Sequence, residues 1–171
     1  LSNADDDSFN VAVGNRALQN QNAAVSAYNT AVGSNAGQSI STGTSNTLVG
    51  SLSGDALTTG NNNVALGYGT LSADVLGSDN VAIGVNSMAS TDNARANVAV
   101  GFSTLQSLDY DTLTYSHNIA IGFDAAKLIT TGTNNTIIGG QAGDALTTGV
   151  RNVAIGKGAL SAETSGSYNV A

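Results

Sequence analysis

The chain has 171 residues, 21 of them glycine and none proline or cysteine, and only 10% are charged, with a formal net charge of −7. Five lysines and arginines cannot build the basic surface that nucleic-acid binding requires, so we expect no nucleic-acid partner. No apolar run approaches the roughly 20 residues that span a bilayer, so we expect no membrane insertion by this segment.

Residues 1–9 form an N-terminal lead-in that contains Asp5, Asp6 and Asp7. Carboxylates are ligands that Ca²⁺ prefers. Three consecutive side chains on a regular strand cannot all point at one ion, because successive side chains face opposite ways. We therefore expect a solvated acidic run and no metal site.

Residues 10–171 repeat a five-residue phrase, in which an asparagine precedes three apolar or threonine residues and a glycine. The asparagines are Asn10, Asn29, Asn46, Asn63, Asn80, Asn97, Asn118, Asn135, Asn152 and Asn169, with spacings of 19, 17, 17, 17, 17, 21, 17, 17 and 17. A fixed period of this length predicts stacked repeats, here called rungs, each burying its apolar face against its neighbours. The array holds nine complete rungs and a truncated tenth, so we expect a segment of a longer chain.

Positions within a rung are counted from the asparagine as position 1. Positions 2 to 4 form a short strand that is apolar on both faces, which indicates a sheet covered on both sides. Position 4 is always Val, Ile or Leu, so we expect it to fill the interior of the coil. Position 3 is mostly alanine, and we expect this column of small residues to allow another chain to approach closely.

Two columns of constant residue type run through the array: the asparagine and the glycine at position 5. The glycines predict a tight corner after each strand, and stacked asparagines predict an amide ladder. The predicted structural ladder comprises Asn29, Asn46, Asn63, Asn80, Asn97, Asn118, Asn135 and Asn152 with Gly33, Gly50, Gly67, Gly84, Gly101, Gly122, Gly139 and Gly156.

A second apolar stretch follows the corner in two versions. Either position 9 is a large apolar residue, or it is glycine and the apolar residue stands at position 12. Examples are Leu18, Leu71, Met88, Leu105 and Leu160 at position 9, and Ile40, Leu57 and Leu146 at position 12. Because an unfilled core position is costly, this compensation predicts that positions 9 and 12 face the same interior.

The period is broken twice, by two extra residues after Asn10 and by four after Asn97. Insertions in repeat proteins form loops that often bind partners, and the longer one, within residues 108–117, combines aromatic and acidic side chains suited to sugars. The predicted receptor-binding residues are Asp109, Tyr110, Asp111, Tyr115 and His117.

Asp109 and Asp111 are also the best candidates for the two carboxylates of a glycoside hydrolase. Charges at a loop tip are usually only solvated, and no nucleophile, phosphate-loop or metal signature stands out. We therefore expect no catalytic residues, no metal and no cofactor.

The phrases Asn80-Val81-Ala82-Ile83-Gly84 and Asn152-Val153-Ala154-Ile155-Gly156, with their Leu-Thr-Thr-Gly returns, resemble two groups of surface fibres. These are the heads of trimeric autotransporter adhesins and the repeat shafts of bacteriophage tail fibres and tail spikes, and the likeness runs from Asn10 to Ala171. The resemblance implies an all-β, parallel β-solenoid or β-roll of about 17 residues per rung, with three chains around one axis, on a virion or a bacterial surface.

The Ala-Leu and Thr-Thr-Gly segments look more like the phage shaft than the shorter adhesin coil. The resulting expectation is a structural segment of an extracellular phage tail fibre that presents a receptor-binding tip. The alternatives are a bacterial adhesin head that binds matrix or glycans, and a glycan-hydrolysing tail spike. The implied partners are two further copies of the chain and a host-surface glycan or protein receptor.

Overall fold

A computed structural model describes residues 9–22 and 26–171. The acidic run Asp5 to Asp7 and most of the expected lead-in therefore lie outside the described residues. The strands are β1 (Val11–Val13), β2 (Thr30–Val32), β3 (Thr47–Val49), β4 (Val64–Leu66), β5 (Val81–Ile83), β6 (Asp92–Arg95), β7 (Val98–Val100), β8 (Asp109–Tyr115), β9 (Ile119–Ile121), β10 (Thr136–Ile138) and β11 (Val153–Ile155).

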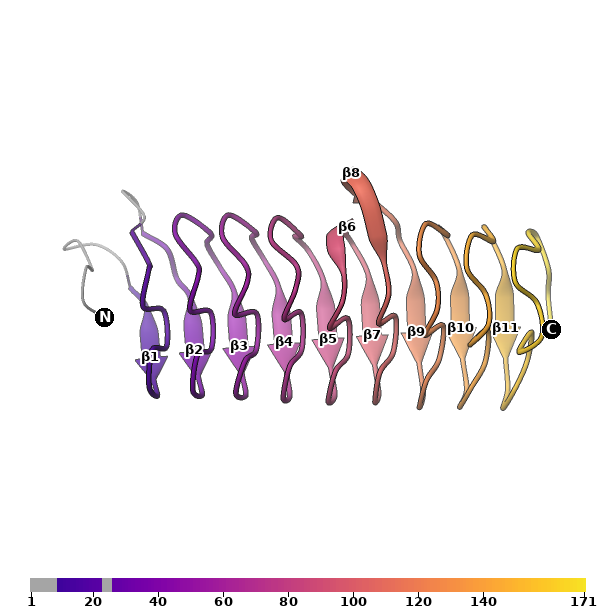
Figure 1. Ribbon diagram of the computed structural model, residues 1–171, viewed down its shortest axis with the longest axis horizontal. Helices are drawn as coiled ribbons and strands as arrows, with labels where there is room; N and C mark the ends of the chain where they lie inside the picture. Colours follow the sequence, from indigo (N-terminus) through magenta and orange to yellow (C-terminus); the bar gives the residue numbers. More distant parts are fainter. Residues whose placement is uncertain (1–8, 23–25) are drawn as a thin grey trace.

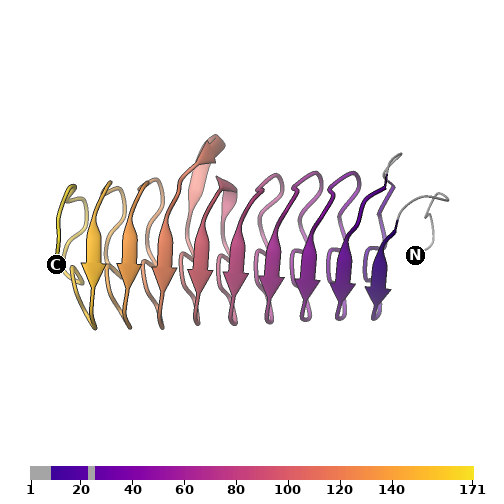
Figure 2. The same ribbon diagram turned by 180° about the vertical axis from the view of Figure 1, so that it is seen from behind.

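Nine of these strands form one parallel sheet in the order β1-β2-β3-β4-β5-β7-β9-β10-β11. Each strand pairs with the next in register, so that Val64 lies beside Val81 and Leu66 beside Ile83. The chain returns behind the sheet after every strand, as both views of the molecule show (Figures 1 and 2). The predicted all-β, parallel β-solenoid with rungs about 17 residues apart is confirmed.

The interior lies behind position 3 of each strand, not behind position 4. The position-3 side chains from Ala31 to Ala154 are completely buried, whereas Leu66 and Ile155 at position 4 are 46% and 60% exposed. The predicted assignment of position 4 to the interior and of position 3 to an outer contact is therefore wrong. Position 3 is small because the interior is narrow and already contains the side chains of positions 9 and 12.

The predicted exchange between positions 9 and 12 is confirmed. Leu71 and Met88 at position 9 are fully buried, and so are Ile40 and Leu57 at position 12. Where position 9 is Gly37, a Cβ atom there would come within 3.0 Å of the side-chain carbons of Leu48 and Ile40, which fill the space. A large residue at position 3 or 12 thus replaces the missing side chain at position 9.

The glycine at position 5 turns the chain out of the strand. From Gly14 to Gly156 these nine glycines have φ between 121° and 144°, a region that other residues rarely adopt. A Cβ atom on Gly84 would also overlap the carbonyl oxygen of Gly101 in the next rung. Both backbone conformation and close stacking therefore require glycine at this corner.

The stacked asparagines bond to one another through the interior. The Asn135 amide nitrogen and its Nδ2 donate to Asn118 Oδ1 at 3.0 and 3.1 Å, and Nδ2 also donates to the carbonyl of Gly149 at 2.9 Å. Asn135 Oδ1 in turn accepts from Asn152. Asn135 thereby ties its strand to the preceding rung and to the end of its own rung, and Asn46, Asn63 and Asn152 do the same.

Candidate interaction surface

The outer face of the nine-stranded sheet is lined by the side chains of positions 2 and 4. These are Val, Ile, Leu or Thr in every strand of the sheet, and they are half-exposed or exposed, as at Val11, Leu66 and Ile121. The corner glycine reverses the chain toward the position-3 side, so the alternation along each strand leaves positions 2 and 4 outside. The sheet therefore presents a long apolar face that no part of the described chain covers.

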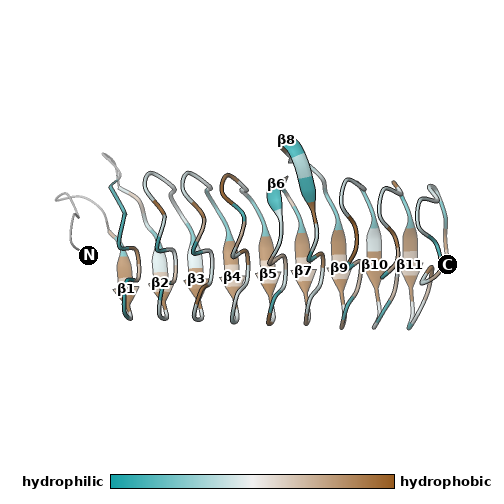
Figure 3. Ribbon diagram, viewed as in Figure 1, coloured by the Kyte–Doolittle hydropathy of each residue, from teal (hydrophilic) through white to brown (hydrophobic). Residues whose placement is uncertain are grey.

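This face is most apolar over four adjacent rungs in its middle. There, positions 2, 4 and 6 are all large and apolar, and we call these twelve residues the central apolar block. The block consists of Val64, Leu66, Tyr68, Val81, Ile83, Val85, Val98, Val100, Phe102, Ile119, Ile121 and Phe123. In Figure 3 the strands of these rungs, β4, β5, β7 and β9, are brown, as are β1 and β11 toward the two ends, whereas β2, β3 and β10 are paler.

Each rung on either side carries a polar or small residue at one or two of these three positions, while position 4 remains Val or Ile. On the β2 and β3 side these are Thr30, Ser34, Thr47 and Ser51, and on the β10 and β11 side they are Thr136, Gly140 and Lys157. The central apolar block is thus bounded along the solenoid axis by more polar surface.

Position 6 extends the block at the corner next to the strands. Tyr68 and Phe123 are 54% and 55% exposed, and the rings of Phe102 and Phe123 stack with their centroids 5.3 Å apart. Exposed, stacked aromatic side chains of this kind favour contact with another apolar surface.

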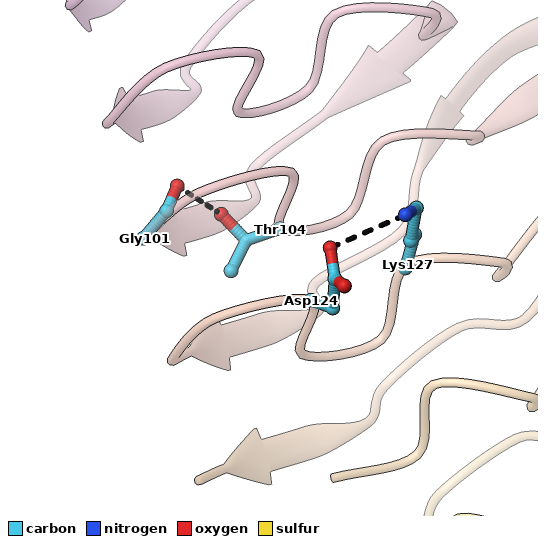
Figure 4. A network of polar contacts seen from close by, with 4 residues as sticks. All are labelled: Gly101, Thr104, Asp124 and Lys127. Carbon is cyan, nitrogen blue, oxygen red and sulfur yellow. Dashed lines mark hydrogen bonds and ion pairs between the residues drawn. The ribbon is translucent and has the colours of Figure 1, made fainter. Parts of the chain in front are cut away.

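Two polar contacts lie next to the block. Thr104 Oγ1 donates to the carbonyl of Gly101 at 3.2 Å, and Lys127 pairs with Asp124 at 3.3 Å, which is the one ion pair within residues 9–22 and 26–171 (Figure 4). Both contacts lie beyond the corner. No charged residue occupies positions 2, 4 or 6 of the four central rungs.

A second candidate surface is the overlong rung after Asn97. Its extra residues lengthen β8, which pairs with β6 in a separate two-stranded sheet whose register shifts between Asp92 and Ala94. Figure 1 shows β8 projecting beyond the line of the other returns, while β6 stays within that line. The insertion therefore forms a ridge on an otherwise uniform rod.

The asparagine ladder continues across this insertion, where some of its hydrogen bonds go to different partners. Asn97 Nδ2 donates to the carbonyl of Arg95 at 3.1 Å instead of to a residue 14 positions later. Ser116 Oγ donates to Asn97 Oδ1 at 2.8 Å. The extra residues therefore bulge outward without opening the core.

Of the five predicted receptor-binding residues, Tyr110 is buried. Its hydroxyl donates to the carbonyl of Gly132 at 2.9 Å, the same carbonyl to which Asn118 Nδ2 donates. Burial raises the pKa of Tyr110. Tyr110 therefore supports the rung from inside and offers no surface to a receptor.

The other four residues, Asp109, Asp111, Tyr115 and His117, are exposed. The rings of Tyr115 and His117 stack with centroids 5.8 Å apart, and the Arg95 guanidinium carbon lies 5.4 Å from the Tyr115 ring centre. The structure thus brings Tyr115, His117 and Arg95 together. Arg95, on β6, could not be placed here from the sequence, because its pairing with β8 spans 20 residues.

One buried carboxylate was not expected from the sequence. Asp74 is at position 12, where Leu57 lies in the preceding rung, and it is completely buried. Its Oδ1 accepts the Gly77 amide at 2.7 Å, and its Oδ2 has no partner. Burial raises the pKa of Asp74 to about 7, opposed by the Gly77 amide and reinforced by the Asp92 carboxylate. No clear signal in the sequence marks it, because position 12 also holds Gln21, Thr91 and Glu163 in other rungs with a large residue at position 9.

The described rungs contain no pocket, no cluster of three metal-ligating side chains, and no helix that could cross a membrane. Asp109 and Asp111 therefore stand on an open ridge. Comparison of the chain with protein-family models, curated proteins and solved structures finds no match.

Proposed function

We propose that this chain is a structural segment of an extracellular homotrimeric fibre, most closely the shaft of a phage tail fibre, which gives mechanical reach and presents a receptor-binding tip. The observation that carries the proposal is the uncovered apolar face of a rod that has no pocket in its described rungs. A surface of this kind favours association over catalysis.

The shape of the face supports self-association. Nine strands about 4.8 Å apart and three residues of about 3.3 Å each outline roughly 40 by 10 Å, or about 400 Å². A patch of this size is on the scale of the largest apolar patches on monomers, about 300–600 Å², which often mark interaction sites. Copies of the same rod supply matching faces of the same length.

The solution mass of the segment tests the proposal. Sedimentation equilibrium over a range of concentrations should give three times the chain mass of 16.9 kDa. A monodisperse monomer at all concentrations would refute the homotrimer and leave a single-chain solenoid.

The second candidate is a bacterial adhesin head, in which the rungs themselves contact matrix or glycans. The projecting strand β8 and the exposed side chains of Asp111, Tyr115 and His117 favour it. A double variant, Asp111→Ala with Tyr115→Ala, should then lose at least tenfold in attachment to matrix or glycan arrays, whereas Thr131→Ala on another exposed return should not. Equal attachment of both variants would show that this ridge does not bind matrix or glycans.

A further inference from the structure

We propose that the copies of this chain hold together mainly through the central apolar block, and that the rungs on either side form a weaker, wetter rim. This inference rests on the proposed self-association and adds where its energy is concentrated. The sequence period alone treats all rungs as equivalent, whereas the exposed positions divide them into two classes.

The first argument is the match between the face and the usual anatomy of interfaces. Interfaces have an apolar core rich in aromatic side chains, surrounded by a polar rim that excludes water. Here Tyr68, Phe102 and Phe123 lie within the four central rungs, whereas the rungs of β2 and β3 carry threonine at position 2 and serine at position 6. The face thus already has a core and a rim along its length.

The second argument concerns charge. The block contains no charged residue, so it offers no complementary site to an acidic or basic partner. Its best partner is a surface that is equally apolar and equally long.

The third argument is symmetry. Rotation about an axis parallel to the solenoid places all copies at the same height. The block of one copy then necessarily lies opposite the blocks of the others, and the rims lie opposite rims. The central apolar block of a second copy can therefore cover this block, and no further structural feature is needed.

The test compares the same substitution inside and outside the block. Val100 in β7 and Val32 in β2 both occupy position 4, and both are half-buried. We expect Val100→Lys to weaken self-association at least tenfold in its dissociation constant, measured by sedimentation, and Val32→Lys to change it less than threefold. Circular dichroism and thermal unfolding monitor the fold of each variant.

A second variant guards against misfolding of the lysine variant. Phe102→Ser with Phe123→Ser introduces the residue that Ser34 and Ser51 already provide at position 6, so the rung accommodates it. We expect the same loss of at least tenfold. Equal effects inside and outside the block would overturn the inference while self-association stands, whereas a monomeric parent chain would overturn the proposed function itself.

Discussion

At the scale of single residues, Asp74 shows how strongly the stacked interior affects the ionisation of one carboxyl group. Each interior position of a rung lies directly above and below its counterparts, so Asp74 at position 12 lies between the buried Leu57 and Thr91 and away from water. Burial makes ionisation of this carboxyl unfavourable, because its Oδ2 has no hydrogen-bond partner, and the adjacent Asp92 carboxylate adds to the effect. The carboxyl is best accommodated when protonated.

We predict that Asp74 makes stability depend on pH. The pKa is about 7 in the folded chain against 3.8 for the free group. Between these values the folded state holds a proton that the unfolded state has lost, so stability falls as pH rises from about 4 to about 7 and is constant above that window. The shift corresponds to roughly 4 kcal/mol at most.

Chemical denaturation at pH 4 and pH 8 checks this prediction. Asp74→Asn should match the parent chain at pH 4 and exceed its stability by up to about 4 kcal/mol at pH 8. Asp111→Asn, which alters an exposed carboxylate, should leave the difference between the two pH values nearly unchanged. A parallel pH dependence of Asp74→Asn and the parent chain would contradict the assignment.

At the scale of one rung, the corner after the strand decides which face of the strand becomes the interior. The left-handed backbone continues past the glycine, since the residue at position 9 has a positive φ whether it is Gly54, Leu71 or Met88. This turn brings positions 9 and 12 against position 3. The long rung keeps the same plan because Tyr110 and Ser116 supply bonds inside while β8 extends outside.

The corner glycines allow conformational strain and stacking to be separated. Gly84 has φ of 121° and lies against Gly101, Gly156 has φ of 129° but no atom within 4 Å of the point where a Cβ atom would lie, and Gly140 has neither constraint. Alanine should therefore cost about 3 kcal/mol or more at Gly84, about 1–2 kcal/mol at Gly156, and less than about 0.5 kcal/mol at Gly140.

Thermal unfolding of the three single alanine variants ranks these losses in the free energy of unfolding. The expected order of melting temperatures is Gly140→Ala above Gly156→Ala above Gly84→Ala. If Gly84→Ala melted with Gly140→Ala, the close approach of neighbouring corners would have no energetic role.

At the scale of the whole molecule, the chain is a one-dimensional array in which each rung contacts its neighbours. In such an array stability is close to a sum of rung and interface contributions. The interior is narrow, so most of the larger apolar side chains outside positions 9 and 12 remain at the surface. In the proposed assembly further copies of the chain would cover these side chains, and the four central rungs would supply the most apolar part of the contact.

Much of the fold followed from the sequence because the 17-residue period, the corner glycines and the exchange between positions 9 and 12 are local or pairwise patterns. Which face of the strand was interior did not follow, because both faces are apolar. A signal was nevertheless present. Position 3 is large only at Leu48 and Ile137, in rungs whose position 9 is Gly54 or Gly143, and this pairing shows that positions 3 and 9 share one space.

The candidate surfaces were likewise only partly predictable from the sequence. The sequence located the overlong rung by counting, but only the structure buried Tyr110, brought Arg95 to Tyr115 and exposed positions 2 and 4. Repetition in the sequence specifies the stacking and its register, because every rung must match the next. The direction of the turn at each corner decides which face of the strand becomes the interior. This direction depends on the three-dimensional geometry of the backbone.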